Sequence, residues 1–231
     1  YVTVSKGYKA GGLQFNPALP EQSFKEETLW NYEAGIRSFF FDRRLMLNMT
    51  AFYMDWKDLQ VASFTTLRDP VSGEINLIET TNNAAKATSK GLELELAAQP
   101  TEQWYMNGAV GYLDAEFDSF PNANITGVNV DLSGRDIIRS AKWTMSFQSQ
   151  YDFPIATSSS LDLNGYIRGE WSYRSKTKPN IEAIVQTGFP NDIPSFHLVN
   201  FRSGVTTDGW RIEAYLENAF NENYFTGHSN F

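Results

Sequence analysis

The sequence contains no cysteine and only two histidines, His197 and His228, in 231 residues. Without cysteine the chain can form no disulfide framework, no thiolate nucleophile and no thiolate metal site. Two histidines far apart in the sequence speak against a His-rich metal centre. No run of apolar residues approaches the roughly 18 that a transmembrane helix requires. We therefore expect no bound metal ion, no other cofactor and no membrane-spanning helix.

Basic residues are also few. The chain has 19 Lys and Arg against 27 Asp and Glu, a net charge of −8, and a pI near 4.8. A nucleic-acid surface needs clustered Lys and Arg, so we expect no nucleic-acid partner. The sequence also lacks a Gly-x-Ser-x-Gly motif, a phosphate loop, a dinucleotide fingerprint and a zinc signature. Together these absences predict that the protein is not an enzyme.

Aromatic residues, by contrast, are abundant: 17 Phe, 11 Tyr and 6 Trp make up 15% of the chain. The dominant pattern is an alternation of apolar and polar residues, which is typical of strands with two unlike faces. It is clearest over 142–153 and 161–173, and leucine alternates with glutamate over 91–96. No stretch shows a helical period. The sequence therefore predicts an all-β chain.

The alternation predicts nine strands, at 1–10, 26–41, 44–62, 83–98, 102–118, 138–153, 160–175, 194–206 and 210–219. The connectors alternate in length. Short turns are expected near 41–44, 99–102, 154–159 and 207–209, and long loops near 11–25, 63–82, 119–137 and 176–193. Short turns at one end and long loops at the other are typical of an antiparallel up-and-down transmembrane β-barrel. In that arrangement the turns are periplasmic and the loops extracellular.

Most of these strands exceed the roughly 9–11 residues that cross the hydrocarbon of a membrane. In lipid, the apolar side chains contact acyl tails while backbone groups are satisfied between strands. The other face then lines a lumen. Its predicted members are Glu33, Arg37, Glu93, Glu95, Lys142, Asp162, Arg168, Glu170, Arg202, Arg211 and Glu213. Glu93 and Glu95 also resemble a catalytic carboxylate pair, but we interpret them as part of the polar wall.

Aromatic residues near the strand ends fit the two membrane interfaces, where an amphipathic ring has one apolar and one wet side. Trp30, Trp56, Trp104, Trp143 and Trp171 are examples. The alternative is that these rings form the core of a soluble protein.

The number of strands is odd, whereas a bacterial antiparallel barrel closes with an even number. Residue 1 already lies within a patterned segment, and 221–231 resembles the start of another long loop. We therefore expect a barrel segment that is incomplete at both ends.

Eight segments, in order, resemble the barrels of TonB-dependent outer-membrane receptors. They are Val4–Gly12, Tyr32–Ser38, Asp42–Asn48, Phe52–Val61, Asn83–Ala87, Gly91–Glu95, Gly111–Glu116 and Glu217–Tyr224. The resemblance implies a 22-stranded barrel, of which this chain corresponds to strands 13 to 21, without the last strand. It also implies an N-terminal plug domain, absent from this sequence, that fills the barrel and engages TonB.

The function implied by the resemblance is TonB-energised uptake across the bacterial outer membrane. The expected partners are the lipid bilayer, the plug, TonB through the plug, and a scarce small ligand. A ferric siderophore is the leading ligand, with cobalamin, haem and oligosaccharide as alternatives. We expect ligand contacts from aromatic and cationic residues of the long loops and the upper lumen: Phe64, Phe117, Phe120, Arg135 and Phe189.

Three other classes of function remain open at this point. A passive porin has the same two-faced wall but is not expected to match the eight segments. A surface enzyme built on a barrel needs a nucleophile and a base that converge in the lumen. A soluble carbohydrate-binding β protein would need no detergent.

Overall fold

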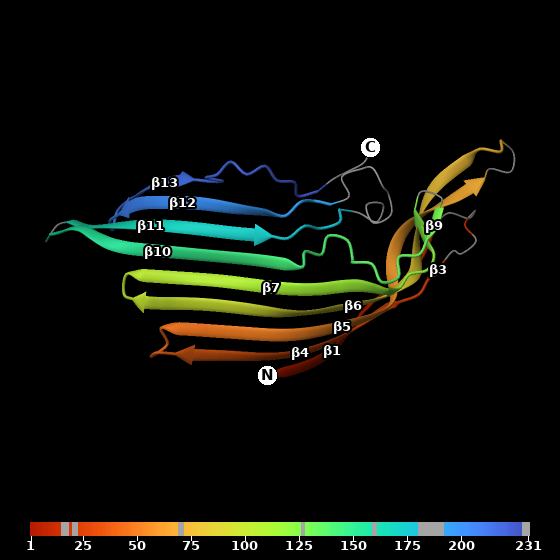
Figure 1. The fold of residues 1–231 in the computed structure, drawn as a ribbon, viewed down its shortest axis with the longest axis horizontal. Helices are drawn as coiled ribbons and strands as arrows, with labels where there is room; N and C mark the ends of the chain where they lie inside the picture. Colours follow the sequence, from red (N-terminus) through yellow and green to blue (C-terminus); the bar gives the residue numbers. More distant parts are fainter. Residues whose placement is uncertain are drawn as a thin grey trace.

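The computed structural model describes residues 1–14, 19, 23–68, 72–125, 128–158, 161–179 and 192–227. Nine long strands form one antiparallel sheet in the order β1-β4-β5-β6-β7-β10-β11-β12-β13. Their bounds are β1 Val2–Lys9, β4 Glu27–Phe40, β5 Leu45–Arg68, β6 Ile75–Thr101, β7 Trp104–Ser119, β10 Trp143–Ser158, β11 Leu161–Arg174, β12 Phe196–Thr206 and β13 Arg211–Leu216. Each strand pairs with the next long strand along the chain (Figure 1). This confirms the prediction of an all-β, up-and-down sheet of about nine strands.

The strands are joined by tight turns at one end of the sheet and by longer segments at the other (Figure 1). The β4–β5 turn has three consecutive residues with positive φ, Phe41, Asp42 and Arg43, and the Arg44 N–H donates to the Phe41 carbonyl at 3.0 Å. In the β12–β13 turn the Thr207 N–H donates to the Trp210 carbonyl at 2.9 Å. Short connections of this kind force consecutive strands to be antiparallel neighbours.

One predicted loop is largely strand. The segment 63–82 was expected to be a loop, but β5 continues to Arg68 and β6 begins at Ile75. The two strands project beyond the rest of the sheet and curve away from it (Figure 1). The segment has polar residues on both sides, so it lacks the apolar alternation on which the prediction depended. Because the strands pair with each other, their backbone groups are satisfied even without a membrane.

Four other connectors also contain or adjoin regular structure. Two small hairpins occupy predicted loops: β2 Gly12–Leu13 pairs with β3 Ser23–Phe24, and β8 Ala123–Ile125 pairs with β9 Val128–Val130. Near the predicted turn 154–159, β10 continues to Ser158 with an irregularity between Pro154 and Ala156. The described ends of the loop 176–193 are joined by Thr177 and Ile193, whose N–H groups donate to each other's carbonyls at 3.0 and 2.8 Å; residues 180–191 lie outside the described part of the chain.

Two strands differ from their predicted bounds at one end. β10 begins at Trp143 rather than near 138, and β13 ends at Leu216 rather than near 219. Arg139 (φ 59°) and Asn218 (φ 48°) both have a left-handed backbone, which interrupts the extended conformation. The Asn218 N–H donates instead to the Asn200 side chain at 2.8 Å.

The pairing register divides the sheet into a polar and an apolar face. Residues directly opposite each other on neighbouring strands share a face. One such row across three strands is Arg37–Asn48–Glu95, and another is Gln148–Glu170–Asn200. Rows of the other face are apolar, for example Met49–Leu94–Val110–Met145–Tyr173.

The apolar face is exposed on the isolated chain. Its exposed side chains include Ile36, Met49, Tyr53, Leu92, Leu94, Phe147, Ile167 and Phe201. A contiguous apolar surface of this extent requires a partner, because monomeric soluble proteins rarely leave one uncovered.

Within the described ranges, no helix is long and apolar enough to cross a membrane.

The buried hydrophobic cluster lies at the loop end of the sheet. Its members are Ala85, Ala87, Phe117, Phe120, Ala123 and Leu132, packed against Trp56, Leu59, Val61, Val130 and Ile137. Ala87 pairs with both Trp56 and Phe117, and the period of two places these residues on the polar-face side of β5–β7. The 119–137 segment therefore folds over the polar face at this end.

Candidate functional site

The polar face is the candidate site, because it gathers the charged residues that the sequence predicts for a lumen. Ten of the eleven share this face in the observed register: Glu33 and Arg37 on β4, Glu93 and Glu95 on β6, Asp162, Arg168 and Glu170 on β11, Arg202 on β12, and Arg211 and Glu213 on β13. The structure brings them together in two separate groups, one over β4–β6 and one over β11–β13.

Lys142 is the exception. It immediately precedes β10, and the Leu113 N–H donates to its carbonyl at 3.0 Å. Its ammonium lies 3.4 Å from Asp136 and 3.9 Å from Asp114. Asp114 pairs with Lys90, on the apolar face. Side chains alternate between the two faces only within a regular strand, and Lys142 lies just before β10 begins. The alternation therefore does not determine on which face the Lys142 side chain lies.

An acidic hollow of about 310 Å³ lies on the polar face of β4–β6. Glu33, Glu93 and Glu95 line it together with a single cation, Arg37. Asn48 connects two of these groups: Arg37 Nε donates to Asn48 Oδ1 at 3.2 Å, and Asn48 Nδ2 donates to Glu95 Oε2 at 3.0 Å. The hollow therefore has an excess of negative charge.

A network centred on Arg202, called here the arginine network, covers the polar face of β11–β13. The guanidinium of Arg202 lies 3.9 Å from Glu170, 3.5 Å from Glu213 and 3.9 Å from Glu217. Arg168 Nε is 3.4 Å from the same Glu170 oxygen. The Nε atoms of Arg168 and Arg202 are buried without a hydrogen bond. In both residues this Nε is the atom that faces Glu170 in the ion pair, so the contact is electrostatic and lacks hydrogen-bond geometry.

Tyr166 extends this network because its neighbour is a glycine. Gly204 lies directly opposite Tyr166, and a Cβ added to Gly204 would be 2.7 Å from the Tyr166 ring. The ring therefore lies across Gly204, where its hydroxyl donates to Glu213 and accepts a hydrogen bond from Arg211 at 2.6 Å. The sequence places Tyr166 in polar register, but nothing in it indicates these contacts.

The loop end carries further ion pairs outside the strands. Asp192 lies 3.3 Å from the Lys176 ammonium and also pairs with Lys178 at 2.5 Å. Hydrogen bonds from Lys178 and Lys176 lower the pKa of Asp192 below its usual value. The Asp136 carboxylate raises the pKa of Lys142, and hydrogen bonds from Ser133 lower the pKa of Asp131. Each of these three shifts favours the charged form of its residue: Asp192, Lys142 and Asp131.

Two of the five predicted ligand contacts are buried. Phe117 and Phe120 are 3% and 1% exposed, and their ring centroids lie 5.3 Å apart. Both rings pack into the hydrophobic cluster, because loop aromatics gain more from mutual burial than from exposure. Their contact with a ligand stays a prediction. Trp56, expected at a membrane interface, packs against the same cluster.

The other three candidates have different outcomes. Arg135 is exposed, and its carbonyl accepts a hydrogen bond from the Phe117 N–H at 2.9 Å. Phe64 lies in β5 opposite Glu79, and its side chain is outside the described part of the structure. Phe189 lies outside the described residues altogether.

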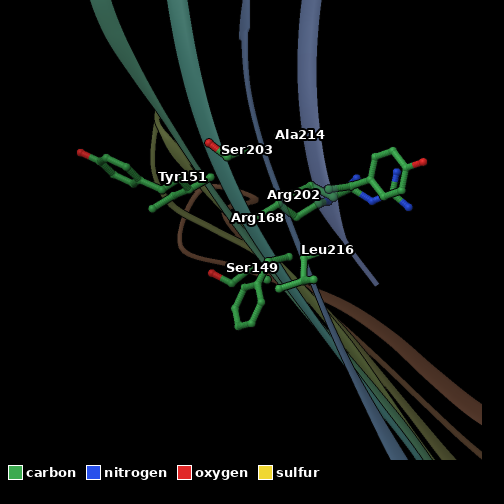
Figure 2. Close-up of a pocket in the computed structure, with 11 residues that line it drawn as sticks. Ser149, Tyr151, Arg168, Arg202, Ser203, Ala214 and Leu216 are labelled. Carbon is green, nitrogen blue, oxygen red and sulfur yellow. The ribbon is translucent and has the colours of Figure 1, made fainter. Parts of the chain in front are cut away.

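A second hollow, of about 540 Å³, lies over β10–β13. The Tyr151 side chain leaves the sheet on one side and those of Arg168 and Arg202 on the other (Figure 2). Tyr215, which pairs with Arg202, also lines the hollow from the polar-face register. The other lining residues form two apolar-face rows, Tyr151–Ile167–Ser203–Ala214 and Ser149–Gly169–Phe201–Leu216. Small residues between large ones therefore make a shallow depression in the apolar face. Among the residues described, no three or more His, Cys, Asp or Glu side chains are placed to hold a metal ion.

Comparison with known proteins identifies the family. Residues 1–219 match the model of the TonB dependent receptor-like β-barrel. The metal-pseudopaline receptor CntO of Pseudomonas aeruginosa is 29% identical over 116 residues, which is 50% of this chain and 14% of CntO. The pesticin receptor of Yersinia pestis is 33% identical over 114 residues, 48% of this chain and 15% of that receptor.

Solved structures agree on the fold. The ferric yersiniabactin uptake receptor FyuA of Yersinia pestis superimposes with a TM-score of 0.69 at 18% identity, over 100% of this chain and 31% of FyuA. The siderophore receptor PiuA of Acinetobacter baumannii gives a TM-score of 0.67 at 17% identity, over 98% of this chain and 30% of PiuA. The chain thus spans less than a third of these receptors.

The relatives are named as receptors or transporters, and family members are bacterial outer-membrane proteins. With a family match that extends over 219 of its residues, the chain belongs to the TonB-dependent receptor-like β-barrel family.

Proposed function

We propose that the chain is part of the wall of an outer-membrane receptor that takes up a ferric siderophore with energy supplied through TonB. The observation that carries this proposal is the two-faced sheet: an exposed apolar face opposite a polar face with two charged groups. The apolar face can contact lipid acyl chains, and the polar face can line a water-filled lumen. The loop end of the sheet is then extracellular, and the tight turns are periplasmic.

The wall does no covalent chemistry in this proposal. The loops and the upper lumen receive the ligand, and Arg135 is an exposed cation there that can contact an anionic chelate. A plug domain, engaged by TonB, fills the lumen and contacts the polar face. The arginine network suits that contact, since it holds the guanidinium groups of Arg168 and Arg202 on the polar face.

The ligand proposal is supported by the relatives. FyuA is named for ferric yersiniabactin and PiuA as a siderophore receptor, while CntO is named for metal-pseudopaline. Cobalamin, haem and oligosaccharide are the alternative ligands that the test must separate.

The test is uptake by iron-limited cells that carry the full-length receptor. Radiolabelled ferric siderophores, cobalamin, haem and oligosaccharides are supplied in turn, with and without TonB. We expect saturable accumulation of one ferric siderophore that is lost without TonB. Uptake that persists without TonB would indicate a passive channel, and selective uptake of another ligand would overturn the siderophore assignment. Alanine at Arg135 should weaken binding, whereas unchanged affinity would remove Arg135 from the site.

A further inference from the structure

The β5–β6 extension, residues 58–85, leaves the sheet at the level where β4 begins. The ladder between β4 and β5 stops at the pair Thr28–Lys57. Asp58, the next residue of β5, has a left-handed backbone with φ 55°, and the register of β5 against β6 shifts twice between Trp56 and Gln60. Bulges of this kind bend a strand and interrupt its pairing. Within the described chain, β5 pairs with β4 no further, and the extension projects from the sheet (Figure 1).

Side-chain carboxamides connect this extension to the segment between β1 and β4. The Lys25 N–H donates to Asn83 Oδ1 at 2.5 Å, and Asn83 Nδ2 donates back to the Lys25 carbonyl at 2.9 Å. Gln14 and Thr81 form the same reciprocal pair, with both distances at 3.1 Å. A carboxamide carries both a donor and an acceptor. Each of these two side chains therefore takes the place of a peptide group in a neighbouring strand.

Gln60 adds a third connection, from β5. Its Nε2 donates to the carbonyls of Ala10 at 2.9 Å and Lys25 at 3.1 Å. Its backbone N–H donates to Glu27 Oε2 at 2.9 Å. Ala10 directly follows β1, whereas Lys25 and Glu27 lie at the approach to β4 and at its first residue. Gln60 thus holds both ends of the β1–β4 connector against the base of the extension.

Asn83 also reaches the bend itself, because its Nδ2 donates to the Asp58 carbonyl at 2.9 Å. Its side chain therefore bridges the two strands of the extension as well as the connector. The three side chains that make these contacts are called here the carboxamide clamp: Gln14, Gln60 and Asn83. The clamp begins where the backbone ladder between β4 and β5 ends, so it continues the connection with side chains.

The hydrophobic cluster holds the other side of the extension. Leu59 and Val61 pack against this cluster, and Gln60 lies between them in the sequence. Because side chains alternate along a strand, Gln60 points away from the cluster and toward the connector. The extension is therefore restrained from two sides, by apolar packing against the 119–137 segment and by carboxamides against the β1–β4 connector.

We propose that Gln14, Gln60 and Asn83 are positioning residues, which hold the β1–β4 connector and the β5–β6 extension as one unit before a ligand binds. The coupling of the two loops does not depend on the proposed function, whereas its effect on ligand capture rests on that function. A loop that is ordered in advance loses less conformational entropy on binding, which favours affinity. The clamp therefore lowers the ligand concentration that the receptor needs, and it takes no part in the later transport step.

The coupling is tested by pulsed EPR on the full-length receptor in detergent. Spin labels at Glu26→Cys in the connector and Glu74→Cys near the tip of the extension report the distance across the clamp, and both positions are exposed. We expect one narrow distance distribution with the clamp intact and a broad one in Gln60→Ala/Asn83→Ala. An equally narrow distribution in the double variant would overturn the coupling.

Matched variants separate the carboxamide chemistry from a general loss of stability. Asn83→Asp keeps the acceptor for the Lys25 N–H but cannot donate to the carbonyls of Lys25 and Asp58, so it should also broaden the distribution. A narrow distribution in Asn83→Asp would overturn the role of the carboxamide. Asn76→Ala, at an exposed asparagine of the same extension, is the control and should leave the distribution narrow.

Folding of the sheet is checked at its opposite end. Labels at Glu102→Cys and Asp208→Cys, in two of the tight turns, should give the same distribution with and without the clamp. If the double variant changes this distribution, Gln14→Ala is measured in its place, because it removes a single arm of the clamp. Gln14→Ala should then broaden the distribution between the connector and the extension, and a narrow one would overturn the coupling.

The role in capture is tested with the radiolabelled ferric siderophore that the unmodified receptor accumulates. In Gln60→Ala/Asn83→Ala the half-saturation concentration for uptake should rise about tenfold, because the loops are ordered only on binding, while the maximal rate stays the same. A lower maximal rate with unchanged half-saturation would overturn the role in capture. A receptor that accumulates no ferric siderophore would instead overturn the proposed function, and the distance measurement would still decide the coupling.

Discussion

At the scale of single residues, two side chains that are adjacent in the sequence lie on opposite faces of the sheet. Leu94 is 38% exposed on the apolar face, whereas Glu95 accepts a hydrogen bond from Asn48 on the polar face. Since side chains alternate along a strand, adjacent residues of β6 meet different surroundings.

The substitution Leu94→Arg should therefore destabilise the full-length receptor by about 2–4 kcal/mol if Leu94 lies near the middle of the bilayer. Glu95→Gln keeps an acceptor for Asn48 and should cost less than about 1 kcal/mol. Unfolding of both variants by urea in lipid vesicles checks the difference. Equal losses of stability would contradict the assignment of the two faces.

A second residue-scale prediction concerns Gly204. A Cβ at this position would lie 2.7 Å from both the Ile212 carbonyl oxygen and the Tyr166 ring. Gly204→Ala should therefore displace Tyr166 and destabilise the receptor by about 1–3 kcal/mol. Gly169→Ala is the matched control, because its Cβ would meet only the Phe201 ring at 3.7 Å. Thermal unfolding in detergent measures both, and a control as damaging as Gly204→Ala would refute the explanation.

At the scale of elements, the 119–137 segment is a fixed part of the structure rather than a free loop. Phe120 and Leu132 are the largest side chains that are fully buried, and the Leu132 N–H donates to the Phe120 carbonyl at 2.9 Å. The segment is therefore attached to the polar-face side of β5–β7 by both packing and hydrogen bonds.

Phe120→Ala should detach this segment, because removing a buried phenylalanine costs about 3–5 kcal/mol. We expect faster hydrogen exchange over 119–137, with the strands of the sheet unaffected. Phe225, which is 65% exposed, provides the control, and Phe225→Ala should leave the exchange unchanged. Exchange that stays slow in Phe120→Ala would show that the cluster does not hold the segment.

The ion pairs of Asp192 predict a pH dependence at the same end of the sheet. Hydrogen bonds from Lys178 and Lys176 lower the pKa of Asp192 below its ordinary value of 3.8. A lowered carboxyl pKa stabilises the folded state above the ordinary value, and this stabilisation is lost as the pH falls through the folded pKa.

The N–H groups of Thr177 and Ile193 donate to each other's carbonyls. Their protection from hydrogen exchange should accordingly decrease below about pH 4. Protection factors from hydrogen exchange at several pH values measure the effect. In Asp192→Asn the protection should be lower at neutral pH and lose this acid transition. An unaltered transition in that variant would assign it to another carboxyl group.

At the scale of the whole molecule, the sheet predicts an orientation in the membrane. The absence of cysteine from this segment allows single cysteines to report it. Glu74→Cys, near the tip of the β5–β6 hairpin, should react with a membrane-impermeant maleimide on intact cells. Asp208→Cys, in the β12–β13 turn, should react only after permeabilisation. The reverse pattern would invert the proposed topology.

Much of the architecture follows from the sequence, because a period of two is a local property. Residues 161–173 alternate without interruption, and β11 Leu161–Arg174 is observed there. Ten of the eleven predicted lumen residues share one face for the same reason. The structure differs from the prediction where the local pattern was absent, as in the β5–β6 extension, or where a residue lies just outside a strand, as with Lys142.

The sequence by itself determined the all-β class, the strand order and the division into two faces, since alternation and turn chemistry act over a few residues. Only the tertiary structure decided which side chains meet. Phe117 and Phe120 are buried by segments distant in sequence, and Tyr166 reaches Arg211 and Glu213 across Gly204. Such contacts depend on the register between strands, which no single stretch of the chain encodes.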